Sequence, residues 1–291
     1  MTALTRTPRA RQLTAAFKRG YDRPVDGFGQ VGDFVRFSGR ALARIFTDVI
    51  FRRRHLDEVA RQVSDIVVGA GAVVVGGGMV FVIAAMSLAT GATLGIQGYE
   101  GLRALGAENL TGIVASFGNI REVTPVIAGV ALAAQIGASF TAELGAKRIS
   151  DEIDALEVMS VPPITYLVST RILAALIALV PLYLVSIFVS FFASKFVTVT
   201  VLGLSEGSYD YYFNLFLPPI DIVYSVIKAA VFAVLVVLIH CWFGYNASGG
   251  PAGVGVAVGR AIRTSIVTIV IANLFLSYLF WGTSTTASLT G

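Results

Sequence analysis

Long apolar runs separated by short polar segments dominate the pattern of this 291-residue chain. A helix needs about 20 apolar residues to cross a hydrocarbon core of about 30 Å. Four runs meet this requirement clearly, and a fifth has small rather than large apolar residues. The five predicted spans are about 66–90, 125–146, 164–194, 219–243 and 261–282. The pattern therefore predicts an all-α integral membrane protein.

The span at 125–146 differs from the others because alanine, glycine and serine fill half of its positions. Small residues let helices approach closely in lipid, so we interpret this segment as an inner span. A re-entrant segment is the alternative.

An amphipathic segment precedes the first span. Arg36, Arg40 and Arg44 recur every four residues, and apolar side chains cover the other face of residues 34–51. A basic stripe on a helix of low overall hydrophobicity is typical of a helix lying in the membrane interface. A helix of a soluble core would show the same pattern, but the chain offers no other soluble domain. We expect a basic tail over 1–33, an interfacial elbow helix over 34–62 and the membrane domain over 63–291.

The distribution of basic residues predicts the orientation. Of the 22 Lys and Arg residues, 13 lie before residue 63, and a cytoplasmic N-terminus puts 18 on the inner side. Because basic residues favour the cytoplasmic side, we expect the N-terminus in the cytoplasm, the C-terminus outside, and a plasma-membrane location.

Composition narrows the function classes further. The chain is 55% hydrophobic and 14% charged, with mean hydropathy +0.77, whereas soluble domains are about 25% charged. One cysteine and two distant histidines argue against disulfides and metal sites. We find no phosphate-binding loop of the Gly-x-x-x-x-Gly-Lys type and no catalytic constellation. We therefore expect no enzyme activity, no bound cofactor or metal, and no nucleic-acid partner.

The most charged stretch between spans is 143–163, which holds two basic and five acidic residues. A charged helix between two spans must lie in water, and we predict that residues 150–161 form a helix that contacts a soluble partner. The expected contact residues are Glu152, Ile153, Asp154, Leu156, Glu157 and Met159. An ordinary hydrophilic loop is the alternative.

Ionisable residues at the edge of the spans are functional candidates. Arg121 and Glu122 stand beside Pro125, at the expected outer start of the second span, and Glu143 lies near its inner end. The Arg121–Glu122 pair could instead cap a helix. We expect Lys228 to extend its ammonium group to the interface.

Two outer loops are expected, over 91–124 and 195–218. The first contains Gly91, Gly95, Gly98 and Gly101 near its start, and the second contains Tyr209, Tyr211, Tyr212, Phe213 and Phe216. These aromatic residues could form an interfacial belt or a docking surface for an extracytoplasmic protein.

Three blocks of the sequence carry a family resemblance. The block from Arg121 to Gly145, REVTPVIAGVALAAQIGASFTAELG, resembles the central block of the MlaE/YrbE permeases. These are membrane subunits of ABC-type lipid transporters that work with MCE-domain proteins. Residues 152–163 resemble the cytoplasmic coupling helix of that family. Lys228–Phe232, Phe243–Tyr245 and Gly259–Thr264 resemble its last two spans and the loop between them.

The sequence also departs from the family pattern. Gln135 stands where the family often has Arg, and Thr124 where it often has Gly. Together with the basic tail, these departures resemble an actinobacterial YrbE subunit, of the B type in an A/B pair.

The resemblance implies a permease that passes a fatty acid, mycolic acid, sterol or phospholipid to or from an MCE-protein conduit, with import favoured. It implies a second permease subunit, preferably in a heterodimer, and a separate ATPase dimer that holds ATP and Mg²⁺. Arg121, Glu122, Pro125 and Gln135 are the implied lipid-binding residues. A scaffold that anchors MCE proteins without moving lipid, and a secondary transporter or channel, are the competing classes.

Overall fold

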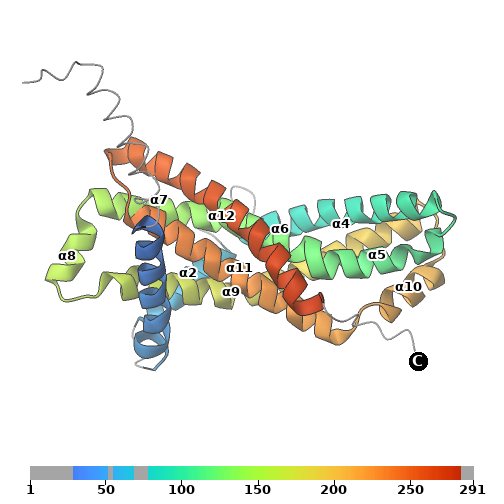
Figure 1. The fold of residues 1–291 in the computed structure, drawn as a ribbon, viewed down its shortest axis with the longest axis horizontal. Helices are drawn as coiled ribbons and strands as arrows, with labels where there is room; N and C mark the ends of the chain where they lie inside the picture. The colour runs from blue at the N-terminus through green and yellow to red at the C-terminus, as the bar shows by residue number, and fades with distance from the viewer. Residues whose placement is uncertain (1–28, 52–54, 69–77, 283–291) are drawn as a thin grey trace, which may run out of the picture.

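The computed structural model describes residues 29–51, 55–68 and 78–282, and every regular element within them is helical (Figure 1). Five helices in this part of the chain are long and apolar enough to cross a membrane. They are Met79–Arg103 (α4), Glu108–Ile149, Ile164–Val201, Pro219–Tyr245 (α11) and Gly250–Trp281 (α12). The predicted all-α fold with five spans is confirmed, and the protein is a multi-pass membrane protein.

Two of these helices contain irregular turns. Glu108–Ile149 consists of η2 (Glu108–Leu110), α5 (Thr111–Phe117), η3 (Gly118–Val123), α6 (Thr124–Leu132), η4 (Ala133–Gly137) and α7 (Ala138–Ile149). Ile164–Val201 consists of η5 (Ile164–Ser169), α9 (Thr170–Lys195) and η6 (Phe196–Val201). Shorter elements are η1 (Ile45–Ile50), α2 (Leu56–Val67), α8 (Glu152–Val158) and α10 (Glu206–Leu215).

The first span begins later than the expected 66–90. α4 starts after Gly78 and runs to Arg103, so the glycines expected in a loop lie within the helix. A Cβ atom on Gly91 would lie 2.4 Å from the backbone oxygen of Ser190, and one on Gly95 would lie 2.9 Å from that of Ser194. The glycines therefore allow α4 to pack closely along α9, a role that small residues often have between membrane helices. Part of the expected span, 69–77, lies outside the described residues.

The second span begins well before the expected residue 125. Its helix has 42 residues, which at 1.5 Å per residue is about 63 Å, roughly twice a hydrocarbon core. The segment crosses the molecule and is not re-entrant. Pro125 does not end the helix. The π-helical turn η3 lies just before it, and the wider hydrogen-bonding pattern of that turn accommodates a residue without an N–H.

The expected aromatic loop contains α10, which packs on α5. Tyr209 is buried with Tyr99, Ala115 and Leu204, and a Cβ atom on Gly112 would lie 2.4 Å from the Tyr209 carbonyl oxygen. Tyr211 is exposed. Most of these aromatic residues therefore hold α10 against α5 rather than forming a continuous surface belt.

The expected elbow helix over 34–62 is two helices. The first covers 29–44 and continues as η1, and the second is α2. The first lies across the long axis of the spans (blue in Figure 1). It buries Phe37, Ala41, Ile45 and Val49 at intervals of four residues, and Phe37 meets Trp242 of α11 with ring centroids 5.3 Å apart. The amphipathic pattern thus marks a helix whose apolar face packs on the spans.

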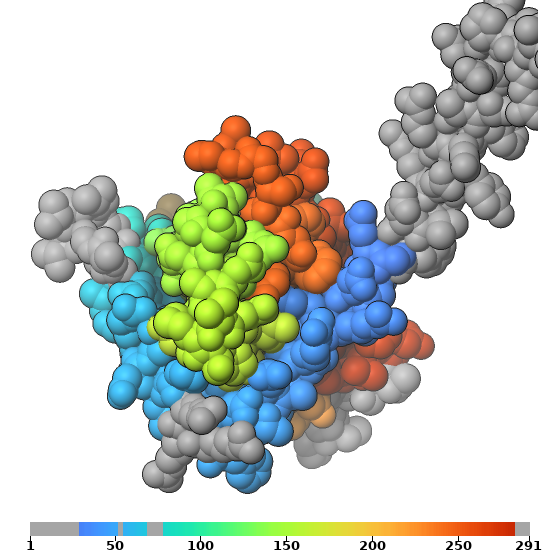
Figure 2. Space-filling model, turned by 90° about the vertical axis from the view of Figure 1, so that its left-hand side faces the viewer, coloured from blue at the N-terminus to red at the C-terminus, as the bar shows by residue number. Residues whose placement is uncertain are grey.

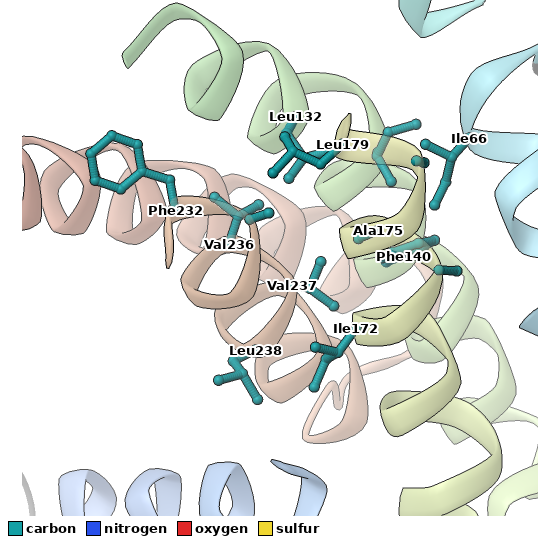
Figure 3. Packing of buried hydrophobic residues seen from close by; sticks show 14 of the residues in the cluster. Ile66, Leu132, Phe140, Ile172, Ala175, Leu179, Phe232, Val236, Val237 and Leu238 are labelled. Atoms are coloured by element: carbon teal, nitrogen blue, oxygen red, sulfur yellow. The ribbon is translucent and has the colours of Figure 1, made fainter. Parts of the chain in front are cut away.

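The apolar core lies where α2, α6, α7, α9 and α11 meet (Figure 3). Ile66, Leu132, Phe140, Ile172 and Phe232 contribute to it from these five elements. Because this core contains parts of three long helices and the short helix α2, it fixes the spans relative to one another.

A buried polar contact also joins three spans. His240 of α11 lies 2.8 Å from the Thr141 hydroxyl of α7 and 3.3 Å from the Ser265 hydroxyl of α12. Gly137 leaves room for the imidazole, because a Cβ there would lie 2.6 Å from the His240 ring.

Candidate functional site

The wide turn at Pro125 exposes two backbone acceptors. Proline has no N–H, so Pro125 cannot donate to the carbonyl oxygens of Ile120 or Arg121 in the preceding turns. Ser225 of α11 donates its hydroxyl to the Ile120 carbonyl at 2.5 Å, and the Lys228 ammonium donates to the Arg121 carbonyl at 2.5 Å. Two side chains of α11 thus satisfy the acceptors that the proline leaves open.

Arg121 forms the first of two ion pairs at this turn. Its guanidinium lies 2.6 Å from a carboxylate oxygen of Asp221, which is fully buried at the start of α11. Trp281, at the end of α12, donates its indole N–H to the other Asp221 oxygen at 2.8 Å. The guanidinium also stacks over the Phe117 ring, 3.8 Å from its centroid. Arg121 is therefore held in place from three spans.

Glu122 forms the second ion pair, with Lys228. Their charged atoms are 3.4 Å apart, and Ser277 and Asn273 of α12 donate to the Glu122 carboxylate at 2.5 and 2.6 Å. The expectation that Lys228 reaches the interface was wrong: its side chain is fully buried, because the Arg121 carbonyl, Ser277 and Glu122 bind its ammonium group inside the protein.

We call this group the Arg121–Lys228 cluster; its members are Arg121, Glu122, Asp221, Lys228, Asn273, Ser277 and Trp281. Its two bases and two acids balance. Burying charges in a membrane protein is costly unless they are paired; here Asp221 and Lys228 are fully buried and the Arg121 side chain is only 13% exposed. The Glu122 side chain alone among the four charges is about half exposed, at 47%. It is the charged group of the cluster that a ligand can reach.

The structure brings Arg121, Glu122 and Pro125 together but leaves Gln135 apart. Gln135 lies on η4, 14 residues after Arg121, which is about 21 Å along a helix. Its buried carbonyl oxygen has no hydrogen-bond partner within the described residues. Gln135 therefore lies at a different depth in the membrane from Arg121 and Glu122.

Sequence reasoning missed four members of the cluster, which are Asp221, Asn273, Ser277 and Trp281. Asp221 is a lone acid in the first turn of an apolar helix, and Asn273 is a lone amide within a span. Either could have been singled out as polar residues within a membrane segment. Their contact with Arg121 and Glu122 required the helix arrangement.

The second candidate site is α8, at the end of the molecule shown in Figure 2. The helix covers Glu152–Val158, shorter than the expected 150–161, because Asp151 and Ser160 have positive φ angles of 59° and 60° and close its ends. A left-handed backbone cannot continue a right-handed helix.

The apolar residues of α8 divide between the core and the surface. Ile153 is fully buried in this chain, and Leu156 packs partly against the same core. Ile153 thus fixes α8 to the protein, contrary to its expected contact with a partner. Val158 and Met159 are 86% and 63% exposed. The exposed apolar surface therefore lies at the C-terminal end of α8.

The acids of α8 differ in their partners. Asp154 pairs with Arg148 of α7 at 2.7 Å, and Glu152 accepts a hydrogen bond from Ser150 at 3.1 Å. Glu157 lines a surface pocket together with Arg44 and the Pro162–Pro163 turn. Asp154 is thus already paired, whereas Glu157 faces a recess.

An ion pair joins the two helices that flank α8. Glu143 of α7 lies 2.8 Å from the guanidinium of Arg171 in α9, and Arg171 is only 5% exposed. A cavity of about 120 Å³ beside this pair is also lined by Glu58 and Arg61 of α2. Burial raises the pKa of Glu58, but hydrogen bonds from Arg61 and Gln62 outweigh it and leave the pKa lower than usual. The Glu143–Arg171 pair therefore joins α7, which precedes α8 in the chain, to α9, which follows it.

Comparison with known proteins agrees with this architecture. The family model Permease MlaE matches residues 68–279. A probable ABC transporter permease protein of Rickettsia prowazekii is 34% identical over 200 residues, which are 69% of this chain and 77% of that protein. The intermembrane phospholipid transport system permease protein MlaE of Haemophilus influenzae is 27% identical over 257 residues, 87% of this chain and 95% of that protein.

Another relative is the chloroplastic protein TRIGALACTOSYLDIACYLGLYCEROL 1 of Arabidopsis thaliana, 34% identical over 177 residues, or 61% of this chain and 51% of that protein. The MlaE match covers four of the five spans completely and α12 almost to its end. It includes α8 and every member of the Arg121–Lys228 cluster except Trp281. This chain belongs to the MlaE permease family, as a membrane-transport component of the ABC type rather than a catalytic subunit.

Proposed function

We propose that this chain is the permease subunit of an ATP-driven lipid transporter and that Glu122 contacts the lipid. The observation that carries this proposal is the Arg121–Lys228 cluster, where paired charges at membrane depth leave one carboxylate half exposed. Such groups inside a membrane protein mark substrate paths. Pro125 contributes through the turn that positions the cluster, and Gln135 would contact the lipid at a separate level.

A phospholipid is the favoured substrate among the lipids considered. The Haemophilus relative is named for intermembrane phospholipid transport, and a phospholipid headgroup carries hydrogen-bonding groups that match Glu122 and Asn273. Fatty acids, mycolic acids and sterols are poorer matches in this respect. Import, and a conduit of MCE-domain proteins on the outer side, are proposed from the family resemblance.

The proposed ATPase contact is the exposed part of α8. Val158 and Met159 supply the apolar surface, and Glu152 and Glu157 supply charges that bases on the partner would neutralise. ATP and Mg²⁺ would bind to that separate subunit. Because Ile153 fixes α8 to the core and the Glu143–Arg171 pair joins α7 to α9, movement of the ATPase would move α7 and α9 together with α8.

A second permease subunit would pack on α12. Val267, Val270, Ile271, Leu274 and Tyr278 form an exposed apolar stripe on this helix, each at least 58% exposed. We favour a heterodimer with an A-type YrbE subunit, this chain being the B type, with the N-terminus in the cytoplasm.

The test is to co-purify this chain with the ATPase that a neighbouring gene encodes and to measure the lipid bound to the complex by mass spectrometry. Glu122→Lys should lower lipid occupancy by about tenfold, as expected when a charge-assisted contact is lost, without loss of subunits. Glu100→Lys, at an exposed glutamate on α4, is the matched control. Unchanged lipid content in Glu122→Lys would refute the lipid contact, and a complex that retains lipid but never transports it would favour the scaffold.

A further inference from the structure

A groove runs along one face of α12 at the end of the molecule near α8. Arg260, Thr264 and Thr268 recur every four residues, so they share one face of the helix. Leu235 and Ile239 of α11 face them across the groove, and the helix over 29–44 closes its third side through Val31 and Phe34. The exposed stripe proposed for a second permease begins beside the groove, at Val267, and continues toward the C-terminal end of α12.

The groove consists of two adjoining cavities of about 270 and 550 Å³. Gln30, Trp242 and Phe243 line both cavities, which makes them continuous. The smaller is lined mainly by apolar side chains. The larger has a mixed lining, in which the polar residues Arg260, Asn246 and Ser248 lie among apolar ones such as Val256 and Ala257. The groove therefore becomes more polar along its length.

The change in polarity coincides with the expected membrane boundary. The helix from Ala261 to Trp281 covers about 31 Å, which matches a hydrocarbon core of about 30 Å. Arg260 then lies at the level of the lipid headgroups, with Thr264 and Thr268 about 6 and 12 Å deeper. A groove that leads inward from a cation and is lined by apolar side chains matches the shape and polarity of a single membrane lipid.

Arg260 itself is exposed, and no acidic side chain in the described ranges forms an ion pair with it. Asp33 lines the same cavity but lies 4.0 Å from Arg36, on its own helix. A guanidinium matches a phosphate group in charge and geometry.

We propose that this groove holds one phospholipid of the leaflet nearest α8, with its phosphate at Arg260 and an acyl chain between α11 and α12. This site lies at the opposite end of α12 from the Arg121–Lys228 cluster, so it is a second lipid site. It stands independently of the proposed transport function, because it requires only that the chain is folded in a membrane.

Other occupants fit less well. Residues 1–28 carry six basic residues, and their charge is of the same sign as that of Arg260. A second copy of the chain would meet a groove already closed on three sides, whereas the apolar stripe of α12 is open.

The test uses the full-length chain in vesicles of phosphatidylcholine. These vesicles contain a small fraction of phosphatidylglycerol that carries a photoreactive diazirine on one acyl chain. After illumination, peptide mass spectrometry locates the labelled residues. We expect labelling of α11 at Leu235–Ile239 and of α12 at Thr264–Thr268. A diacylglycerol probe with the same diazirine but no phosphate should label this groove about tenfold less, the factor for one charge-assisted hydrogen bond.

Three variants separate the groove from general lipid contact. Arg260→Glu should lower groove labelling by about tenfold and leave labelling of the exposed stripe beyond the groove, Val270–Tyr278, unchanged. Arg263→Glu, at an exposed arginine that does not line the groove, should leave both unchanged. Thr268→Trp, which fills the apolar end, should abolish groove labelling.

Three results would overturn the proposal. One is equal labelling of the groove by the diacylglycerol probe, and another is unchanged labelling in Arg260→Glu. The third is an unlabelled groove in a chain whose exposed stripe is labelled. In that case, chemical cross-linking would identify residues 1–28 or a second copy as the occupant.

Discussion

The ammonium nitrogen of Lys228 lies 2.5 Å from the carbonyl oxygen of Arg121, an acceptor that Pro125 leaves without a helical donor. A helix irregularity in one span thus requires a buried cation in another. The same lysine pairs with Glu122. The backbone of the second span and the charge balance of the cluster are therefore coupled through one side chain.

Removing the acid that neutralises Arg121 should destabilise the protein. Asp221→Ala leaves a mostly buried guanidinium without its partner, which costs about 3–5 kcal/mol. The measurement is the midpoint of thermal unfolding of the purified protein in detergent. Asp210→Ala breaks the exposed pair with Lys195 and should cost at most about 1 kcal/mol. Equal effects of the two substitutions would contradict the importance of the buried pair.

The glycines of α4 should differ in their tolerance of alanine. Gly91→Ala places a Cβ atom 2.4 Å from the Ser190 backbone oxygen, so α4 and α9 must separate, at a cost of about 1–3 kcal/mol. Gly101→Ala meets nothing within 4 Å and should stabilise the helix by about 0.5–1 kcal/mol. Thermal unfolding of both variants measures the difference. A tolerated Gly91→Ala would show that the two helices are not in close contact.

Charges introduced at the end of α8 should affect partner binding but not folding. Val158 and Met159 are exposed, so Val158→Asp with Met159→Asp should leave the unfolding midpoint unchanged. ATPase co-purification should fall by about tenfold or more, as expected for the loss of apolar contacts worth about 1.4 kcal/mol. Leu156→Asp with Glu157→Arg should have the same effect on co-purification.

The control for this prediction is Leu105→Asp, at a side chain that is 79% exposed on the turn after α4. It should retain the ATPase. Full ATPase recovery with the Val158 and Met159 variant would place the contact elsewhere on the chain.

The Glu143–Arg171 pair should show strong coupling in a double-mutant cycle. Glu143→Leu leaves Arg171 buried at 5% exposure without a countercharge, which costs about 3–5 kcal/mol. Adding Arg171→Leu removes that uncompensated charge, so the double variant should recover stability. We expect a coupling energy of about 1–3 kcal/mol from unfolding midpoints. Additive effects would mean that the pair does not link α7 to α9.

Hydropathy predicted five helical spans, but the residues at which the first two begin and end were known only from the structure. The apolar run that begins at Ile66 contains the glycines that precede α4. Nothing in composition separates a glycine in a loop from a glycine between helices. Gly91 and Gly95 lie in α4 because α9 packs against them, a contact between residues about 100 positions apart.

For α8, the sequence located the charged segment, but only the tertiary structure shows which of its apolar residues are buried and which are exposed. Ile153 and Val158 are both apolar residues on a short helix, yet one is buried and the other is 86% exposed. The helix is anchored by the face that meets the core, and that face depends on how α7 and η5 enter and leave the turn.

By itself, the sequence determined an all-α membrane protein with five spans, an amphipathic N-terminal helix and a charged segment between spans. It did so because hydropathy and helical periodicity are properties of neighbouring residues. The tertiary structure decided that Asp221, Lys228, Asn273 and Trp281 join Arg121 and Glu122. These contacts join three spans, and their geometry depends on the angle and depth at which the helices pack, which no local pattern encodes.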